Sequence, residues 1–259
     1  MDIFSMMEGQ LGVFLLIFTR VSGMFVTAPV FGSRNLPVYA KAGLALALTY
    51  ILFPLFFNTD IQIPDAILPY SLLVLKEFVV GLLLGFVSSM VFYTVQMSGH
   101  LLDMQIGFGI VNTIDPTNGQ QIPLVGNFKY ILALLIFLAI NGHHVLLAAL
   151  FSSFKMIPLT QVILHNTLAD IFVDIISQSF VIAFKICIPV IVALLLMDIA
   201  LGILARTMPQ MNIFVVGIPG KIIIGVFVLS LALPFYILFL EVAFNGMYSD
   251  IYRILSNLS

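Results

Sequence analysis

The side chains of this chain that could do chemistry are carboxylates and histidines set within apolar stretches. Three aspartates, Asp103, Asp174 and Asp198, are of the type with which an intramembrane protease activates water. None of them stands in a Gly-x-Gly-Asp context, and the sequence holds no HExxH, no GxSxG and no glycine-rich phosphate loop with a lysine. The sequence therefore offers no catalytic constellation, and we expect a protein that is not an enzyme.

Two adjacent histidines, His143 and His144, are the next candidates, because imidazole nitrogens bind zinc. Adjacent side chains diverge on a helix, and no third ligand stands at helical spacing, so we expect neither a metal site nor a cofactor. Asn141-Gly142, just before them, predicts a local break in a helix. The single cysteine, Cys187, lies in an apolar run and is expected to be a small buried hydrophobe.

Single charges inside apolar stretches form a third group, and they are costly in lipid without a partner or a polar path. The group comprises Arg20, Lys76, Glu77, Asp174, Lys185 and Asp198. Arg20 admits two interpretations: an ion-paired or snorkelling side chain, or a contact with a partner subunit or a water-filled path. Lys76 and Glu77 are adjacent and point in different directions on a helix, so each is expected to have another partner.

A polar stripe follows further along the chain. Asp170, Asp174 and Gln178 recur every four residues, and Lys185 comes three helical turns after Asp174. The stripe indicates either contact with a polar groove, a partner or water, or simply a helix that begins outside the bilayer.

Composition indicates the environment of these residues. Hydrophobic residues make up 61% of the 259-residue chain and charged residues 8%, far from the composition of a soluble domain. The net charge of −2 is too small to indicate nucleic-acid binding. We therefore expect most of the surface to face membrane lipid or other apolar helices.

Six stretches are apolar enough to predict membrane spans, at about 20 residues each. They are Leu11–Gly32, Ala42–Phe57, Ile67–Val95, Tyr130–Leu150, Ile171–Ala205 and Ile213–Gly246. The runs are continuous rather than alternating, which predicts helices and not a barrel. We expect an all-α integral membrane protein of about six long apolar helices, with Pro189 and Pro234 kinking the last two.

Basic residues predict the orientation. The first, third and fifth connections and their flanks hold Arg34, Lys41, Lys129, Arg206 and Lys221, whereas the other side holds Lys155 and Arg253. The positive-inside rule then places both termini outside the cytoplasm.

The segment between the third and fourth stretches is unusual. "GFGIVNTIDPTNGQQIPLVGN" is too polar and glycine-rich for a spanning helix, yet it is too apolar for an ordinary solvated loop. Gly107 and Gly109 permit backbone conformations closed to other residues, and Phe108, Ile110 and Val111 supply apolar bulk. From the residues alone, both an ordinary packed interhelical loop and a bendable apolar obstruction remain open.

Three further segments carry a family resemblance. "FTRVSGMFVTAPVFGSRNLPVYAKAGLALALT" (Phe18–Thr49), "MQIGFGIVNTIDPTNG" (Met104–Gly119) and "FLAINGHHVLL" (Phe137–Leu147) are similar in order and spacing to the FliR/SctT family of type III secretion export gates. The "FGSR-x-x-P" pattern resembles the flagellar branch more than the injectisome branch.

The resemblance implies a fusion of two partner-like parts. Residues 1–165 would be FliP-like and include the plug loop at about 105–119. Residues 166–259 would form a FliQ-like helical hairpin, since "ILARTMPQMNIFVVGIPGKII" (Ile203–Ile223) resembles the turn of such a hairpin. Family members assemble into a helical cone around a channel, so apolar surface would face FliP and FliQ as well as lipid.

The function implied is that of a non-enzymatic subunit of the flagellar type III protein export gate in the bacterial inner membrane, within the basal body. It would form the export channel with FliP and FliQ, meet FlhB and FlhA, and pass unfolded flagellar substrates. The implied plug comprises Gly107, Phe108, Gly109, Ile110, Val111, Thr113 and Ile114. Expected partner contacts are Arg34, Lys41, Arg206, Met208, Met211 and Lys221.

Two alternatives differ in what passes the membrane. An injectisome gate subunit would share the architecture but not the cargo. A small-molecule secondary transporter would use a midplane site of broken helices, for which Asp174 and Lys185 are candidates.

Overall fold

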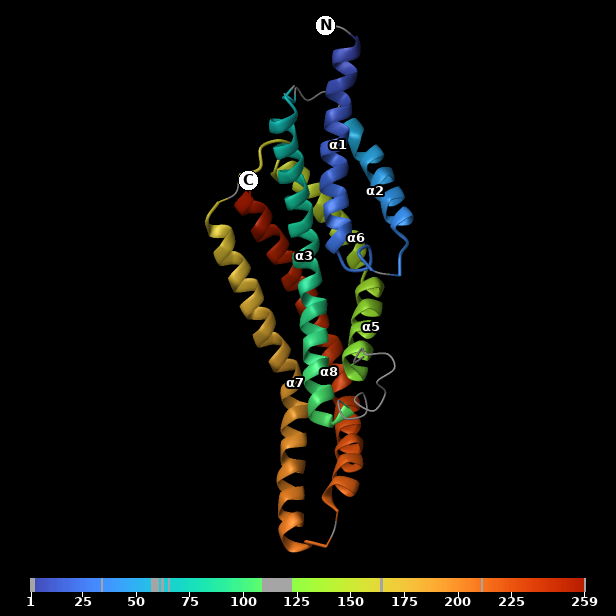
Figure 1. Cartoon of the computed structure of the whole chain (residues 1–259), viewed down its shortest axis with the longest axis vertical. Coiled ribbons are helices and arrows are strands. Elements are labelled where there is room, and N and C mark those ends of the chain that lie inside the picture. Colours follow the sequence, from blue (N-terminus) through green and yellow to red (C-terminus); the bar gives the residue numbers. More distant parts are fainter. Residues whose placement is uncertain are drawn as a thin grey trace. The chain divides into compact units, whose positions relative to one another are not determined.

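The computed structural model describes residues 3–33, 35–56, 61, 63–64, 66–108, 123–163, 165–210 and 212–258. Within these ranges the chain is helical and contains no strand, which confirms the all-α prediction (Figure 1). The elements are α1 (Ile3–Thr27), α2 (Val38–Leu52), the 3-10 turn η1 (Phe53–Phe56), α3 (Ile67–Ile106), α5 (Leu124–Ala139), α6 (Gly142–Met156), α7 (Thr167–Thr207) and α8 (Ile213–Leu258).

Three helices are longer than their apolar runs predict. α3 extends beyond Val95 to Ile106, while α7 and α8 reach 41 and 46 residues. α7 continues through Pro189, and α8 continues through Pro219 and Pro234. In the part of the chain described, five helices are long and apolar enough to cross a membrane, or up to six if the bent pair of α5 and α6 is one span.

The fourth predicted span, Tyr130–Leu150, is wrong as a single helix. α5 ends at Ala139 and α6 begins at Gly142, and the two are bent by 68°. Asn141 has a left-handed backbone with φ of 57°, a conformation that asparagine tolerates better than most residues. The break predicted at Asn141-Gly142 is therefore confirmed.

The described residues form two compact units. The first comprises residues 1–90, 141–175 and 245–259. Its core includes Leu16, Ile17, Val21 and Met24 of α1, all fully or almost fully buried. α1 and α3 approach closely because Gly81 lies against the backbone of Arg20 and would clash there with any side chain. Figure 1 shows α2 alongside α1 in this unit.

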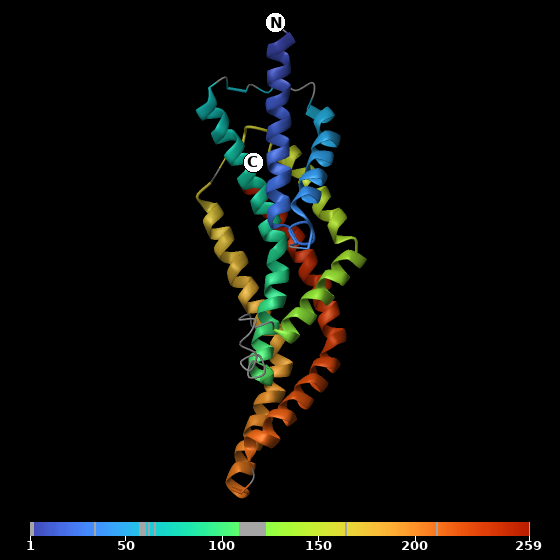
Figure 2. The ribbon, with the colours of Figure 1, turned by 45° about the vertical axis from the view of Figure 1, so that its right-hand side comes forward.

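The second unit comprises residues 91–140 and 176–244. One buried cluster joins α3, α5 and α7 through Leu102, Ile106, Val125, Cys187, Val190 and Leu194. Cys187 is fully buried, as predicted from its apolar surroundings. In this unit α7 and α8 run side by side to the turn that joins them (Figures 1 and 2).

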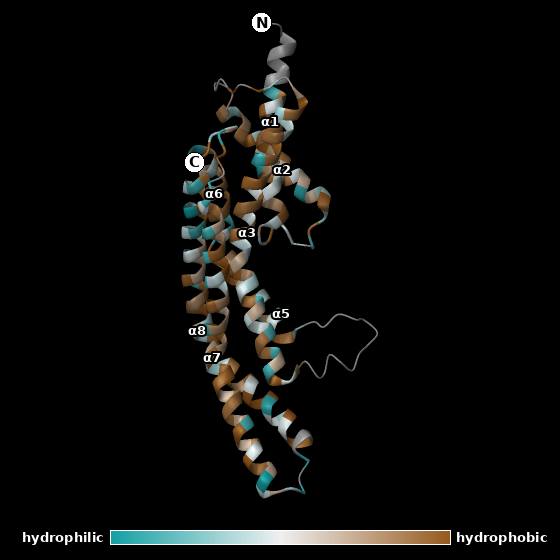
Figure 3. Ribbon diagram, turned by 60° about the vertical axis from the view of Figure 1, so that its left-hand side comes forward, coloured by the Kyte–Doolittle hydropathy of each residue, from teal (hydrophilic) through white to brown (hydrophobic). Residues whose placement is uncertain are grey.

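The long C-terminal helices expose many apolar side chains. Exposed residues of α7 extend from Val173 to Leu204, and those of α8 include Val215 and Val242. Figure 3 shows hydrophobic colour along most of both helices. Such surface is unfavourable in water, so lipid or other protein must cover it.

Candidate functional site

The predicted plug segment begins where α3 ends. The amide of Gly107 donates to the carbonyl of Asp103, 3.2 Å away, and Gly107 then adopts a φ of +101°. A glycine with positive φ directly after the last helical residue is a common helix stop, because it has no side chain to clash. Gly107 therefore ends α3 and turns the chain out of the helix direction.

Phe108 is the last described residue before residues 109–122. It is partly buried and packs against the cluster that contains Leu102, Ile106 and Val125. The other predicted plug residues, Gly109, Ile110, Val111, Thr113 and Ile114, lie outside the described residues.

The chain re-enters the described structure at Pro123, the N-cap of α5, which makes no side-chain capping bond. The cap comes instead from α3. Oδ1 of Asp103 accepts the amide of Val125 at 2.9 Å, and Oδ2 accepts the amide of Gly126 at 3.1 Å. Asp103 is only 4% exposed. One buried carboxylate thus joins the end of the helix before the segment to the start of the helix after it.

Two glycines bring these helices into contact. A side chain at Gly99 would clash with the backbone of Gly126, whose nitrogen lies 2.6 Å from the ideal Cβ position. The backbones of α3 and α5 therefore touch one turn below the Asp103 carboxylate.

Ser98 accepts two hydrogen bonds in this unit, one at its hydroxyl and one at its carbonyl. Nζ of Lys129 donates to its hydroxyl at 2.7 Å, and Sγ of Cys187 donates to its carbonyl at 3.1 Å. The phenol of Tyr236 donates to the carbonyl of Lys129 at 3.0 Å, while Nζ of Lys129 lies 4.8 Å from the Tyr236 ring centre. Polar contacts therefore link α3, α5, α7 and α8.

The placement of Lys129 corrects one count made from the sequence. Lys129 is 2% exposed inside α5, so it is not a free loop cation. The first, third and fifth connections therefore hold one basic residue fewer. The excess of basic residues over the other side, which favours cytoplasmic placement of these connections, is smaller by one.

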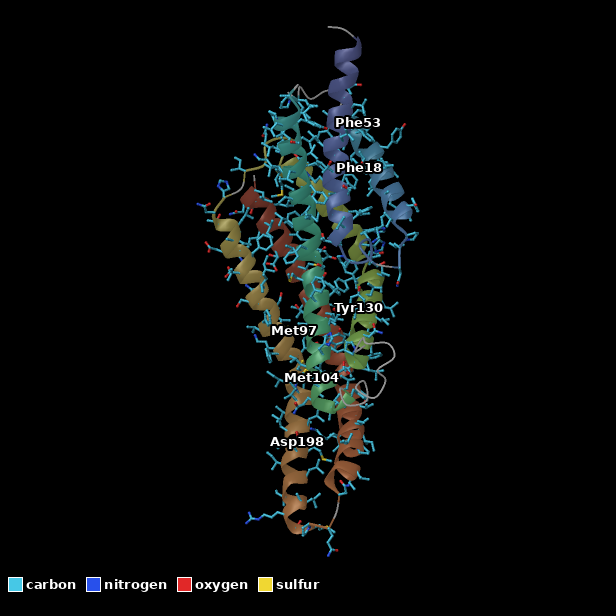
Figure 4. The ribbon with its side chains drawn as sticks, viewed as in Figure 1. Phe18, Phe53, Met97, Met104, Tyr130 and Asp198 are labelled. Atoms are coloured by element: carbon cyan, nitrogen blue, oxygen red, sulfur yellow. The ribbon has the colours of Figure 1, made fainter. Side chains whose placement is uncertain are left out.

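A cavity of about 400 Å³ lies beside the C-terminal end of α3, where the predicted plug segment begins. Its lining includes Met104 and Gly107 from the end of α3, and Asp198 and Lys221 from α7 and α8. Nζ of Lys221 lies 2.7 Å from Oδ1 of Asp198. Figure 4 marks Met104 on α3 and Asp198 on α7. Asp198 was predicted as an intramembrane polar residue and Lys221 as a contact with a partner subunit, yet the two form an ion pair with each other.

Arg20 is the centre of a buried polar cluster in the first unit. Its Nη2 lies 2.6 Å from Oε2 of Glu77, and both side chains are fully buried. Nη1 donates to the carbonyls of Ser153 and Ile157, each at 3.0 Å. The guanidinium carbon also lies 4.4 Å from the ring centre of Phe154. Of the two interpretations left open for Arg20, the ion-paired one is confirmed.

Lys76 and Glu77 have separate partners, as their adjacency predicts. Nζ of Lys76 donates to the carbonyl of Val162 at 3.3 Å. The second oxygen of Glu77 accepts the amide of Thr160 at 3.1 Å. Glu77 therefore holds both α1 and the connection that follows α6.

The polar stripe of α7 is exposed along its length, at Asp170, Asp174, Gln178 and Lys185. Asp174 pairs with Arg253 at 3.0 Å, with both side chains about half exposed. Lys185 lines an apolar cavity of about 510 Å³ in the second unit, together with Lys129 and Tyr236.

Of the expected partner contacts, Lys221 pairs with Asp198, and the other five fall into three groups. Arg34 and Met211 lie outside the described residues. Lys41 donates to the carbonyl of Gly32 at 3.0 Å. Arg206 and Met208 are exposed at the end of α7 and in the turn that follows it.

Sequence reasoning missed the role of Asp103 and the burial of Lys129. One signal was available for the first: α5 begins after a proline, which offers no capping side chain, so a carboxylate from elsewhere could serve.

Comparisons with known proteins agree with the resemblance. Residues 11–247 match the family model described as bacterial export proteins, family 1. The flagellar biosynthetic protein FliR of Bacillus subtilis (strain 168) is 43% identical over 217 residues, 82% of each chain. FliR of Pectobacterium carotovorum is 32% identical over 93% of this chain and 92% of its own. FliR of Escherichia coli (strain K12) is 28% identical over 92% and 91%.

Proposed function

We propose, because the chain belongs to family 1 of the bacterial export proteins, that it is a subunit of the flagellar type III export gate and forms the channel with FliP and FliQ. Membership of this family makes it a transport component of flagellar export and not an enzyme. The proposal adds the inner membrane of the basal body as its place and the plug as its contribution.

The lengths of the exposed apolar faces carry the assembly part of the proposal. The exposed residues of α7 from Val173 to Leu204 extend over about 47 Å at 1.5 Å per residue. A hydrocarbon core of about 30 Å would cover that length only at a tilt of about 50°, beyond the range seen for spanning helices. Lipid therefore leaves part of this face uncovered, and apolar partner helices such as those of FliP and FliQ would cover the rest.

The division into a FliP-like part (1–165) and a FliQ-like part (166–259) fits the same picture. α7 and α8 are two long helices joined by a short turn between Thr207 and Ile213. A hairpin of that kind buries one face on itself and leaves its other faces for neighbouring hairpins.

The plug is proposed for Gly107, Phe108, Gly109, Ile110, Val111, Thr113 and Ile114. Two observations support this placement: Gly107 directs the chain out of α3, and Asp103 holds the two ends of the segment at one place. Apolar side chains in a narrow pore exclude water and ions by dewetting. A chain with glycines can still yield to an unfolded substrate.

The basic turns and nearby methionines are proposed as contacts for FlhB and FlhA. They are Arg34, Lys41, Arg206, Met208, Met211 and Lys221. The exposure of Arg206 and Met208 supports this role, whereas the bond from Lys221 to Asp198 gives Lys221 a competing intramolecular one.

A deletion of Phe108–Val111 tests the proposal. The complex should still co-purify with FliP and FliQ, and cells should lose membrane potential or admit a small dye. The matched control deletes residues 118–121 of the same segment, which removes the same length of chain but none of the apolar bulk. An assembled, export-competent complex without conductance would contradict the plug, and a stable monomer that binds neither partner would contradict the gate.

A further inference from the structure

We propose that the cavity lined by Lys129 and Lys185 binds an anionic phospholipid, with the lipid phosphate on the ammonium group of Lys185 and one acyl chain inside the cavity. The cavity has a volume of about 510 Å³ and lies within the second unit, where most of its lining comes from α7 and α8. It shares no residue with the proposed plug or with the proposed contacts to FlhB and FlhA.

The lining of the cavity suits a hydrocarbon chain. Among the lining residues, only Lys129, Lys185 and Tyr236 have polar side chains, and the others are apolar residues such as Val190 and Phe239. The volume falls within the range of about 300–1,000 Å³ that small-molecule sites occupy. Water would find few hydrogen-bond partners on such walls, so an apolar group fills the cavity favourably.

Lys185 supplies an uncompensated charge at this cavity. It is exposed on α7 among the apolar neighbours Phe184 and Ile186, and within the described ranges it forms no ion pair. A single ammonium group in apolar surroundings is costly unless an anion or water reaches it. Basic pockets between apolar helices bind the head groups of anionic lipids, because the phosphate provides that anion.

Lys129 adds a second positive charge to the wall of the same cavity. It is 2% exposed, its Nζ binds the hydroxyl of Ser98 at 2.7 Å, and the same atom lies 4.8 Å from the ring centre of Tyr236. Neither contact carries a full negative charge, and no carboxylate pairs with Lys129 in the described part of the chain. Two cations without a counter-charge therefore favour an anionic lipid over a neutral one.

The position of Lys185 along α7 fits the surface of a hydrocarbon core. The 20 residues 186–205 lie between Lys185 and Arg206, and Asp198 is the only charged residue among them. At 1.5 Å per residue this stretch extends over about 30 Å, which is the thickness of the core. Val190 lies on the hydrocarbon side of Lys185, so a chain attached to a phosphate at Lys185 would run into the cavity.

This placement leaves room for partner subunits on the same helix. The exposed apolar residues Phe180, Val181 and Phe184 precede Lys185 and lie beyond a core that begins there. Partner helices would cover those residues, whereas lipid would cover the stretch that contains the cavity. The lipid site thus goes beyond the proposed gate function and does not depend on it.

Photoreactive lipids test the inference on the purified full-length chain, together with whatever subunits co-purify with it, in vesicles of phosphatidylcholine. Traces of phosphatidylglycerol or phosphatidylcholine with a diazirine in one acyl chain are added, and labelled peptides are mapped by mass spectrometry after illumination. Peptides that contain residues 186–190 and 228–239 should be labelled about fivefold more by the phosphatidylglycerol probe, which is the preference expected from one lysine at a lipid phosphate.

Four variants separate the charge from the cavity, with labelling compared per purified chain. Lys185→Gln should abolish the preference for phosphatidylglycerol, and Lys185→Arg should keep it. Ala232→Phe should lower labelling by both probes, because the added ring occupies the cavity while both lysines remain. Lys155→Gln is the matched control: it removes the charge of another exposed lysine, at the end of α6 in the other unit, and should change nothing.

The expected pattern supports the lipid site, and three results would overturn it. One is equal labelling of the cavity peptides by both probes, or a preference that survives Lys185→Gln. Another is undiminished labelling in Ala232→Phe. The third is a cavity without label while other parts of α7 are labelled, which would mean that protein covers it. Absence of FliP and FliQ from the purified material would count against the gate alone, because the label on this chain still reports the lipid.

Discussion

Buried charges are satisfied differently in the two compact units. In the first unit, Arg20 and Glu77 pair directly at 2.6 Å, with both side chains fully buried. In the second unit, Asp103 and Lys129 are also buried and opposite in sign, but they do not form an ion pair. Asp103 binds the amides of Val125 and Gly126, while Lys129 binds the hydroxyl of Ser98.

The difference indicates what each arrangement can do. A direct pair whose other bonds go to two backbone carbonyls and one backbone amide joins α1, α3, α6 and the connection after α6 at one point. Two separate charges instead bind different groups, Asp103 two amides of α5 and Lys129 the hydroxyl of Ser98, so each can be weakened without the other. We interpret the first as a fixed joint and the second as two supports that can be changed one at a time.

The largest effect is expected from breaking the direct pair. Glu77→Leu leaves Arg20 buried and uncompensated and should cost about 3–5 kcal/mol. Arg20→Met with Glu77→Leu should recover at least half of that loss, because neither charge is then left alone. The measurement is the temperature at which half of the purified complex has unfolded.

The control for this comparison is the same double-mutant cycle, with single and double substitutions of Asp103 and Lys129. The two side chains do not share a bond, so their coupling should stay below about 0.5 kcal/mol. A coupling as large as that of Arg20 and Glu77 would mean that the two units do not differ in the way described.

The second prediction compares two close helix approaches along α3. Gly81 lies against the backbone of Arg20 in the first unit, and Gly99 lies against Gly126 in the second. Because the neighbours are backbone atoms, alanine at either position should cost about 1–3 kcal/mol. Gly43→Ala, where nothing lies within 4 Å, should be neutral or slightly stabilising.

The functional consequence of the two alanines should differ. Gly81→Ala should lower the amount of assembled complex with no leak from the complexes that remain. Gly99→Ala should lower assembly and also admit dye, because it moves the start of α5, which Asp103 binds and which directly follows the proposed plug segment. Equal leaks per assembled complex in both strains would remove the distinction between joint and support.

Much of the fold could be predicted from the sequence, because apolar runs of this length have few alternatives to helix. The break at Asn141-Gly142 was also predictable, since asparagine and glycine tolerate the left-handed backbone seen there. The extension of α3 from Val95 to Ile106 was not: Gln96, Ser98 and His100 interrupt the apolar run but are accommodated within a helix packed on neighbours. The hydropathy of a sequence shows which part of a helix suits lipid, but it does not show where the helix ends.

The pairings were less predictable than the residues. Arg20, Glu77 and Asp198 stood out as charges in apolar surroundings, and Lys221 as a basic residue expected to contact a partner. Their pairings nevertheless join residues 57 and 23 positions apart in the chain. The cap of α5 by Asp103 depends on a close approach of Gly99 and Gly126 that one sequence does not reveal. Tertiary contact, not local pattern, decides these bonds.

The smallest effect on stability is expected at the cavity beside the C-terminal end of α3. Lys221 and Asp198 pair at 2.7 Å, but their side chains are 20% and 40% exposed, so breaking the pair should cost less than about 1 kcal/mol. Lys221→Glu should nevertheless reduce swimming while the complex still assembles, because it reverses a charge expected to face FlhB or FlhA. The measurements are motility in soft agar and recovery of the complex with FliP.

A charge swap decides which role of Lys221 matters. Asp198→Lys with Lys221→Asp restores the intramolecular pair but leaves the reversed charge at position 221. If the pair with Asp198 is what counts, the swap restores swimming; if a partner contact counts, swimming stays impaired although the pair is back. Arg253→Glu is the matched control, because it breaks an even more exposed pair with Asp174 in the other unit. Equal swimming in all three strains would remove Lys221 from the partner surface.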